Sequence, residues 1–544
     1  MNRAERLLER QKHAYGMRVF FHGQWREQSD YFRQSVDNIG AEQRQSPTPN
    51  TSRQSGLFDT TGVEACQAYA AGCMAWLSPS ESAWFKFEPP KPFDGSDAVQ
   101  EWYGQCTEIT REILANSNFY REIHKAYLDD GAFGTSALVV EPDGQFGLNF
   151  KALRIGTYSI LEDSRGVVDT VFAEFDFTAK QAVERFGEDM VSKKVREAYL
   201  DPKRMDKDRF RFVRTVVPNN EAQAGKIDES GMAYQVVWVE EREKKEVKVE
   251  GAWEMPILVH RHQCYTDTVW GFGPGWRALP DMRQLNDMQI LLDTQVETAV
   301  IPRVLAHADH EDMIDMRAGG VTYFTDPGSV PRVWLNDSNY PQGLDRIEWR
   351  QANVRRTFYN HLFQLLSEMP PGKEMTATEV MQRQRDQLPA FSPTFASKMT
   401  EIFNPLGRRA FGVLLRLGAY PEPPRELVQE SEEGVIVPDP KMTYTSRMAL
   451  QIEAIENESF LRYFEQSSAL MQVHPGVADH IDWDKVARGM ARNEGVKEDW
   501  IKSEMDVEGM REAQAEEEAR LQQQEEEMAA VDAASQLGSA GVLK

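Results

Sequence analysis

The chain has 544 residues, of which 41% are hydrophobic, and its formal net charge is −24 at pH 7. This length allows about three or four domain-sized units with buried cores. No run of about 18 apolar residues occurs, and residues 1–6 lead into a charged helix instead of a signal peptide. We therefore expect a protein that is made in the cytosol, with no transmembrane helix and no membrane partner.

Acidic residues dominate the charge along the whole chain. Residues 503–527 carry a net charge of −8, and the other −16 is spread over the rest. An acidic surface excludes ordinary tight binding to DNA, because neutralising phosphates takes a basic surface. It suits a conduit through which DNA slides, because repulsion keeps the DNA off the wall.

The four cysteines are Cys66, Cys73, Cys106 and Cys264. Four thiols in a chain of this length do not make a disulfide framework, and none forms the C-x-x-C pair of a zinc site. We expect them to be reduced and mostly buried.

The first half of the chain alternates between helical and strand patterns. Helices are expected at residues 1–45, 57–77, 97–116, 118–130 and 178–199. Strands are expected at residues 84–87, 136–140, 146–150, 158–162, 167–177, 210–217, 234–239, 246–249 and 257–260. Residues 46–52 form a linker by composition. This mixture predicts an α+β unit over residues 1–270.

Two long helices follow, and a small turn-rich insert separates them. Residues 280–300 and 345–368 each carry apolar side chains at helical spacing. The insert, residues 302–343, has strand patterns at 321–324 and 330–335. Helices of similar length joined in this way are expected to lie antiparallel.

The second long helix must end at Met369-Pro370-Pro371-Gly372-Lys373-Glu374, because proline lacks an amide hydrogen and clashes with the preceding turn. A long, kinked helix begins at Thr376, where Glu379 completes a capping box. In a single subunit this loop is an ordinary turn between helices. In a ring, one Lys373 per subunit would face a central hole and make weak phosphate contacts.

Residues 446–527 are expected to be nearly all helical, and the segment from Val531 to the end is small and polar, which is typical of a mobile tail.

No local motif identifies an enzyme. Gly271-Phe272-Gly273-Pro274-Gly275 lacks the spacing of a dinucleotide loop, so a tight turn before a helix is favoured. The segment His307-Ala308-Asp309-His310-Glu311-Asp312 has the residue types of a hydrolytic metal site, but a solvated polar segment is favoured there. We expect no cofactor and no bound metal.

Five stretches along residues 60–510 share an order that is specific when they are taken together. They are Asp59-Thr60-Thr61-Gly62 through Leu77-Ser78-Pro79-Ser80 and Trp84-Phe85; Asp129-Asp130-Gly131-Ala132-Phe133-Gly134-Thr135; the glycine-rich turn at 271–275 with Leu279-Pro280-Asp281 and Leu285-Asn286; Met375-Thr376-Ala377-Thr378-Glu379-Val380; and Tyr444-Thr445-Ser446 with Ala449-Leu450. Together they resemble the portal, or head-to-tail connector, family of short-tailed phages. The family commonly has a basic residue where Phe272 stands, so a subunit contact made there would differ in this chain.

The resemblance implies an α+β, mainly helical portal fold with a wing, a stem, a clip and a helical crown. The expected domains are a wing (1–280), a stem helix (281–301), a clip (302–343), a second stem helix (344–369), a channel loop (370–375), a long kinked wing helix with the following strand segment (376–445), a crown (446–527) and a flexible tail (528–544).

The resemblance also implies a function. The expected protein is non-enzymatic and forms a dodecameric ring at one capsid vertex of the virion, assembled in the host cytoplasm. Double-stranded DNA would be packaged and ejected through this ring. The implied partners are the terminase motor, tail or adaptor proteins, and capsid and scaffolding proteins. Two alternatives of other classes stay open: a metal-dependent hydrolase that uses His307 to Asp312, and an acidic helical scaffold protein.

Three groups of site residues follow from this interpretation. The channel loop is Pro370, Pro371, Gly372, Lys373 and Glu374; the candidates that line the stem lumen are Asp287, Asp293 and Glu297; and the structural family motifs include Gly271, Gly273, Pro274, Gly275, Thr376, Thr378 and Glu379.

Overall fold

The computed structural model describes most of the first 446 residues. The described ranges are 2–34, 39, 56–93, 96–145, 147–220, 222, 231–265, 267–300, 304–305, 332–333, 340–364, 391–431 and 434–446, with isolated positions between 483 and 520. The chain divides into unit 1 (Met1–Met448) and unit 2 (Ala449–Lys544). The expected linker at 46–52, the strand at 321–324 and nearly all of the expected helical region 446–527 therefore lie outside the described residues.

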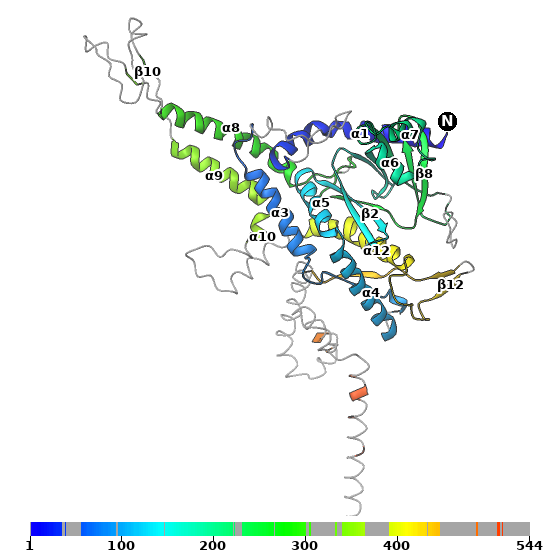
Figure 1. Cartoon of the computed structure of the whole chain (residues 1–544). Coiled ribbons are helices and arrows are strands. Elements are labelled where there is room, and N and C mark those ends of the chain that lie inside the picture. Colours follow the sequence, from blue (N-terminus) through cyan, green and yellow to red (C-terminus); the bar gives the residue numbers. More distant parts are fainter. Residues whose placement is uncertain are drawn as a thin grey trace, which may run out of the picture. The chain divides into compact units, whose positions relative to one another are not determined.

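The largest sheet of unit 1 is an antiparallel meander with the strand order β4-β5-β6-β7-β8. Its strands are β4 (Tyr158–Glu162), β5 (Val168–Thr178), β6 (Arg209–Pro218), β7 (Tyr234–Glu240) and β8 (Lys245–Ala252). Successive side chains of a strand point to opposite faces, so this sheet supports two cores. Val213 and Val237 pack on one face with α1 (Arg3–Phe32), and Phe212 and Trp238 pack on the other face. The helices on that second face are α6 (Ala179–Phe186) and α7 (Lys193–Leu200) (Figure 1).

A second, three-stranded sheet has the order β3-β2-β9, and helices surround it. The strands are β2 (Thr135–Asp143), β3 (Gly147–Leu153) and β9 (Ile257–Arg261). The helices that pack against this sheet are α4 (Asp97–Asn116), α5 (Phe119–Phe133) and α12 (Asn404–Arg416), and α3 (Thr61–Leu77) packs on α5. Two short antiparallel pairs complete the body: β1 (Phe85–Glu88) with β14 (Lys441–Tyr444), and β12 (Gln429–Ser431) with β13 (Gly434–Ile436).

Several helices differ from the sequence predictions. The helix expected at 1–45 is α1, which ends at Phe32. The helix expected at 178–199 is two helices, because Gly187 after α6 has φ +88°, a conformation that favours glycine and ends a helix. The helix expected at 345–368 is α9 (Tyr340–Thr357) followed by α10 (Asn360–Gln364), with Tyr359 at φ +58° between them. The described end of the kinked helix has a π-helical turn, Met399–Phe403, before α12 (Asn404–Arg416).

The four cysteines are free thiols, as expected. Cys66, Cys73 and Cys106 are buried, and Cys264 is exposed. Burial raises the pKa of the Cys66 thiol to about 12, so this group stays protonated at neutral pH.

Candidate functional site

α8 (Pro274–Val300) and α9 form a helical hairpin that extends from the rest of unit 1 (Figure 1). Arg277 Nη2 donates to Tyr359 Oη at 3.1 Å, and farther along α8 the carboxylate of Asp281 accepts from Arg350 Nη1 at 2.7 Å. As the residue number rises along α8, from 277 to 281, the number of the residue that it contacts falls, from 359 to 350, so the two helices run antiparallel. At the far end, β10 (Val304–Leu305) pairs with β11 (Arg332–Val333).

α8 starts earlier than expected, at Pro274, and runs through Pro280. Pro274 fits the first position of a helix because an amide there has no partner within the helix. The glycine-rich turn is therefore the immediate start of the hairpin.

This turn packs directly on the step from α5 to β2. A Cβ atom added at Gly271 would lie 2.3 Å from the carbonyl oxygen of Gly134, and one added at Gly273 would lie 2.5 Å from the carbonyl oxygen of Asp130. Gly275 makes a third contact of this kind, and Gly134 has φ +81°. Two of the five family-like stretches thus meet backbone to backbone, where no side chain fits.

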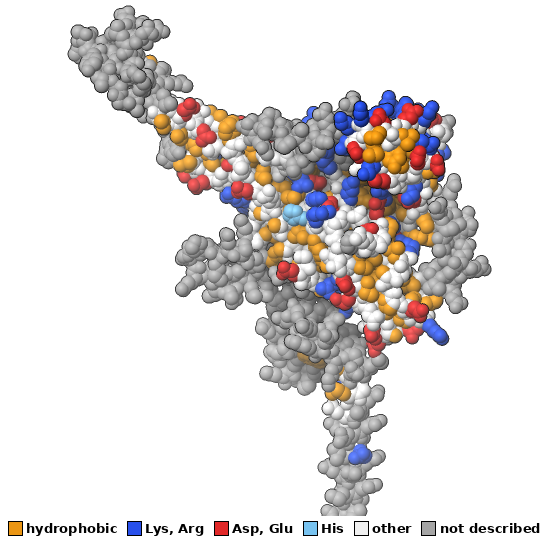
Figure 2. All heavy atoms as spheres, in the orientation of Figure 1, with side chains coloured by type: hydrophobic (Ala, Val, Ile, Leu, Met, Phe, Trp, Pro, Cys, Tyr) orange, Lys and Arg blue, Asp and Glu red, His pale blue; other side chains and the backbone are white. Residues whose placement is uncertain are grey.

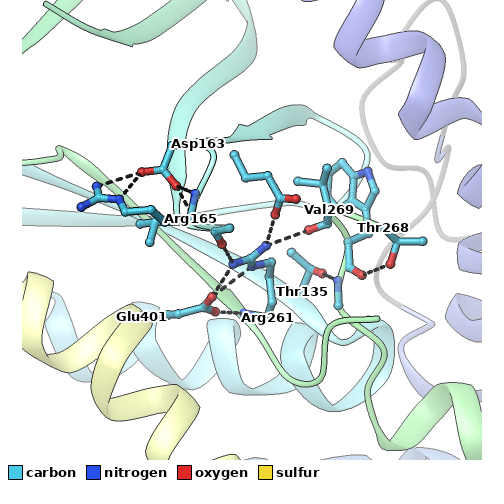
Figure 3. Close-up of polar contacts among 12 residues, drawn as sticks. Thr135, Asp163, Arg165, Arg261, Thr268, Val269 and Glu401 are labelled. Atoms are coloured by element: carbon cyan, nitrogen blue, oxygen red, sulfur yellow. Dashed lines mark hydrogen bonds and ion pairs between the residues drawn. The ribbon is translucent and has the colours of Figure 1, made fainter. Parts of the chain in front are cut away.

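Arg261, the last residue of β9, fixes the segment before the glycine turn (Figure 3). Its guanidinium donates to Glu401 at 2.7 Å and to Glu162 at 2.9 Å. It also donates to the carbonyl oxygens of Gly166 at 2.7 Å and Val269 at 3.5 Å. A planar guanidinium can serve several acceptors at once, so one residue ties β9, the β4–β5 turn, the π-helical turn and the approach to α8 together.

Asp130 is the centre of a buried polar cluster behind the glycine turn. Its carboxylate forms an ion pair with Lys398 and accepts from Tyr69 Oη at 2.6 Å. His260 Nδ1 lies 3.1 Å and His262 Nδ1 lies 3.4 Å from its Oδ1. All five side chains are buried, and they come from α3, α5, β9, the position directly after β9 and the helical segment before the π-helical turn.

The cluster holds charge in the core. Burial by itself would raise the pKa of Asp130, but Lys398 and the two histidines outweigh it and hold this pKa well below its ordinary range. Burial lowers the pKa of His262, so this imidazole is neutral at neutral pH. The pKa of the neighbouring Asp129 shifts in the opposite direction to that of Asp130. Burial raises the pKa of Asp129 to about 6, although the charge of Arg33 opposes this shift.

The start of α3 is bound to both helices of the hairpin. Asp59 accepts from its own helix at Thr61 N and from Gln351 Nε2, both at 2.8 Å. Asn286 Oδ1 accepts from Phe58 N at 2.8 Å. The residue before the first family-like stretch therefore contacts the Leu285-Asn286 end of the third stretch, and the stretch itself contacts α9 through Asp59.

The three lumen candidates lie on one face of α8. All three are exposed. At about 100° per residue, Glu297 is about 160° around the helix from Asp281, which contacts α9, and Asp287 and Asp293 are each about 120° from it. We call the face that they share, which points away from α9, the acidic face of α8. Toward the base of the hairpin the same face also carries Arg283, which is paired with Glu27 of α1, and the exposed Ile290. The structure contains one subunit, so whether this face lines a lumen stays a prediction.

Other predicted site residues lie outside the described residues. These are the channel loop, from Pro370 to Glu374, and the residues Thr376, Thr378 and Glu379. The possible metal ligands from His307 to Asp312 also lie outside. Within the described ranges, no group of three or more His, Cys, Asp or Glu could hold a metal ion, and no helix there is long and apolar enough to cross a membrane.

Sequence reasoning missed the residues that fix the hairpin base. Asp130 belongs to a family-like stretch, but nothing in the sequence says that its charge is buried. Lys398, Arg261 and Glu401 belong to no motif, and their partners are far away along the chain. Only the tertiary structure brings them together.

The described geometry is that of a structural protein: a helical hairpin with an acidic face, anchored on an α+β body. The model of the family described as "Bacteriophage head to tail connecting protein" matches residues 4–502. The chain belongs to this family, and the predicted resemblance is confirmed. The protein is therefore a non-enzymatic component of the virion at the junction of head and tail. The hydrolase and scaffold alternatives are not favoured.

Two curated relatives align over nearly the whole chain. The "Probable portal protein" of Bordetella phage BPP-1 is 27% identical and covers 96% of this chain and 92% of its own length. The "Portal protein" of Salmonella phage epsilon15 is 25% identical and covers 94% of this chain and 91% of its own length.

Two solved structures also align with this chain. The chain from "Virion of native gene transfer agent (GTA) particle" gives a TM-score of 0.35 at 9% identity and covers 78% of this chain and 91% of that chain. The chain from "Neck of empty GTA particle computed with C6 symmetry" gives 0.32 at 9% identity, with 69% and 84% covered. These scores are too low to support an argument.

Proposed function

We propose that the protein is a phage portal: a dodecameric ring at one capsid vertex through which double-stranded DNA is packaged and later ejected. The family match over residues 4–502 carries the proposal. Two relatives with the printed name of portal protein support it, because they align over more than nine-tenths of this chain.

The proposed domains follow this role. The α+β body is the wing, the α8–α9 hairpin is the stem, and residues 302–343 at the far end of the hairpin are the clip. The clip is the surface for the terminase motor during packaging and for tail or adaptor proteins afterwards. Residues 370–375 are the channel loop, and residues 446–527 form the crown, which faces the interior of a capsid assembled with scaffolding proteins in the host cytoplasm.

The acidic face of α8 is the proposed channel wall of the stem. Glu297 is its centre, with Asp287 and Asp293 on its flanks, and all three are exposed in the subunit. DNA carries one negative charge per about 1.7 Å of helix axis, so an acidic wall offers no binding site at which it would stall. Within a Debye length of about 8 Å at physiological salt, repulsion keeps the duplex away from the wall.

Ring formation is tested with the full-length wild-type protein at micromolar concentration, by negative-stain electron microscopy and analytical ultracentrifugation. We expect rings of twelve subunits with a central hole. A stable monomer, without rings at any salt concentration tested, would refute the proposal.

The channel wall is tested with the double variant Asp287→Lys/Glu297→Lys. We expect rings of unchanged mass whose DNA translocation in a packaging reaction is slowed, most strongly at low salt, because lysines bind phosphates. The control is Asp189→Lys, which reverses one exposed charge on the loop between α6 and α7, outside the hairpin. Equal translocation by all three proteins at low salt would show that this face does not line the channel.

A further inference from the structure

The α8–α9 hairpin exposes large apolar side chains beyond the point where the body of unit 1 supports it. On α8, Leu291 is 68% and Val296 is 44% exposed; on α9, Trp349 is 57% and Leu344 is 37% exposed. Figure 2 shows apolar side chains beside acidic ones on the surface of this hairpin. Neighbouring exposed apolar side chains mark an interaction surface.

One side of the hairpin is defined by its contacts with α3 and the segment before it. Met282 on α8 packs against Gly62, and Gln351 on α9 donates to Asp59. At about 100° per residue, Val296 is only about 40° around α8 from Met282, and Leu344 is about 20° around α9 from Gln351. Val296 and Leu344 therefore continue this side, the α3 side, toward the far end of the hairpin.

The other two apolar residues lie on the opposite side. Leu291 is about 180° around α8 from Met282, and Trp349 is about 160° around α9 from Gln351. We call this the free side. Both sides flank the acidic face of α8, so the hairpin has one acidic face between two apolar ones.

The two sides are complementary in charge as well as in apolar character. On the free side, Arg346 lies three residues before Trp349, which places a cation beside an aromatic ring on one face of α9. On the α3 side, Asp293 lies three residues before Val296, which places an anion beside an aliphatic group on α8. Arg346 and Asp293 are exposed, and Asp293 accepts a hydrogen bond from Gln289 Nε2 of its own helix at 3.2 Å. Asp345 and Arg346 lie on opposite sides of Trp349 around α9, so Asp345 is at the outer edge of the free side.

We propose that the free side of one subunit docks on the α3 side of the next, so that Trp349 and Arg346 of one copy pack against Val296 and Asp293 of its neighbour. This inference rests on the proposed ring. Two different, complementary surfaces on one chain make a head-to-tail interface, and such an interface closes into a ring when the rotation between copies divides the circle evenly. The same arrangement turns the acidic face of every α8 toward one common space.

The test uses two single variants of the full-length protein, each with one negative charge introduced on one side of the hairpin. Trp349→Asp alters the free side, and Val296→Asp alters the α3 side. Each variant is expected to form rings at a protein concentration at least about tenfold above that of the wild type, because an unpaired carboxylate would be buried at every interface. Leu200→Asp is the control, since Leu200 on α7 is 68% exposed and lies outside the hairpin. It should form rings as the wild type does.

Mixing the two variants gives the decisive result. The intact free side of the Val296→Asp chain can dock on the intact α3 side of the Trp349→Asp chain, but neither remaining side can extend the assembly. At concentrations at which neither variant forms rings alone, we therefore expect the mixture to form dimers of twice the 62.2 kDa chain mass and no rings, by mass photometry after cross-linking.

Wild-type-like rings from either single variant would overturn the docking proposal and leave the ring itself intact. Absence of rings from the wild type would instead overturn the proposed function. Circular dichroism checks the fold of each variant. If Trp349→Asp is unfolded, Leu291→Asp replaces it on the free side, with the same expected results.

Discussion

Loss of the Lys398 ammonium group should destabilise unit 1 more than any exposed substitution on its surface. In Lys398→Met, the carboxylate of Asp130 stays buried with Tyr69 and two histidines but without its cation. Removing one partner of a buried ion pair typically costs about 3–5 kcal/mol. Both side chains here are 1% exposed, so solvent does not screen the loss, and we expect a cost in this range.

The assay is urea denaturation followed by tryptophan fluorescence, with Lys193→Met as the matched control. Lys193 has a side chain that is 90% exposed, so its replacement should change the free energy of unfolding by less than about 0.5 kcal/mol. The double variant Asp130→Asn/Lys398→Met removes both charges, and its cost should fall short of the sum of the two single costs by about 1–3 kcal/mol. A cost below about 1 kcal/mol for Lys398→Met, or simple additivity in the cycle, would refute the reasoning.

Three further results are expected. The pKa of His262 is lower in the folded chain than in the unfolded chain, so neutral His262 stabilises the fold fully above the unfolded pKa of about 6.5, and this stabilisation is lost as the pH falls below that value. Between pH 7.5 and 5.5 the free energy of unfolding should therefore drop less in His262→Gln than in the wild type. Gly275→Ala places a Cβ atom 2.2 Å from the carbonyl oxygen of Ala132 and should lower the melting temperature at a cost of about 1–3 kcal/mol or more, whereas Gly343→Ala, with open space around it, should not; equal melting temperatures would contradict the packing argument. Lys373→Glu in the proposed channel loop should leave ring assembly intact and alter packaging or retention of DNA; unchanged packaging and retention would remove the role assigned to this lysine.

Much of the local structure was predictable because it depends on neighbouring residues. The strand pattern at 158–162 predicted β4, and the helical spacing at 97–116 predicted α4, each with the bounds that the structure has. The failures occurred where one backbone conformation decides the outcome. Gly187 divides the helix expected at 178–199, and the positive φ of Tyr359 separates α9 from α10. A positive φ at a tyrosine has no sequence signal, because only the surrounding packing can stabilise it.

The candidate site was predictable in outline but not in its chemistry. The order of the family-like stretches identified the family, and the acidic residues of α8 share a face as their helical spacing requires. What those stretches do is visible only in the tertiary structure. The glycine turn packs against the backbone of Gly134, where no side chain fits, and hydrogen bonds of Asp59 and Asn286 join the start of α3 to the hairpin.

The sequence by itself determined the family, the acidic character and the helical character of the hairpin, because motif order, composition and periodicity are properties of the chain read in one dimension. Only the tertiary structure decided which charges are buried and which sides of the hairpin are open. Lys398 and Asp130 are 268 residues apart, and no local pattern can indicate that they meet in the core. In the same way, Trp349 and Val296 are ordinary apolar positions on helices until the packing of α3 shows that the body of the protein leaves both of them uncovered.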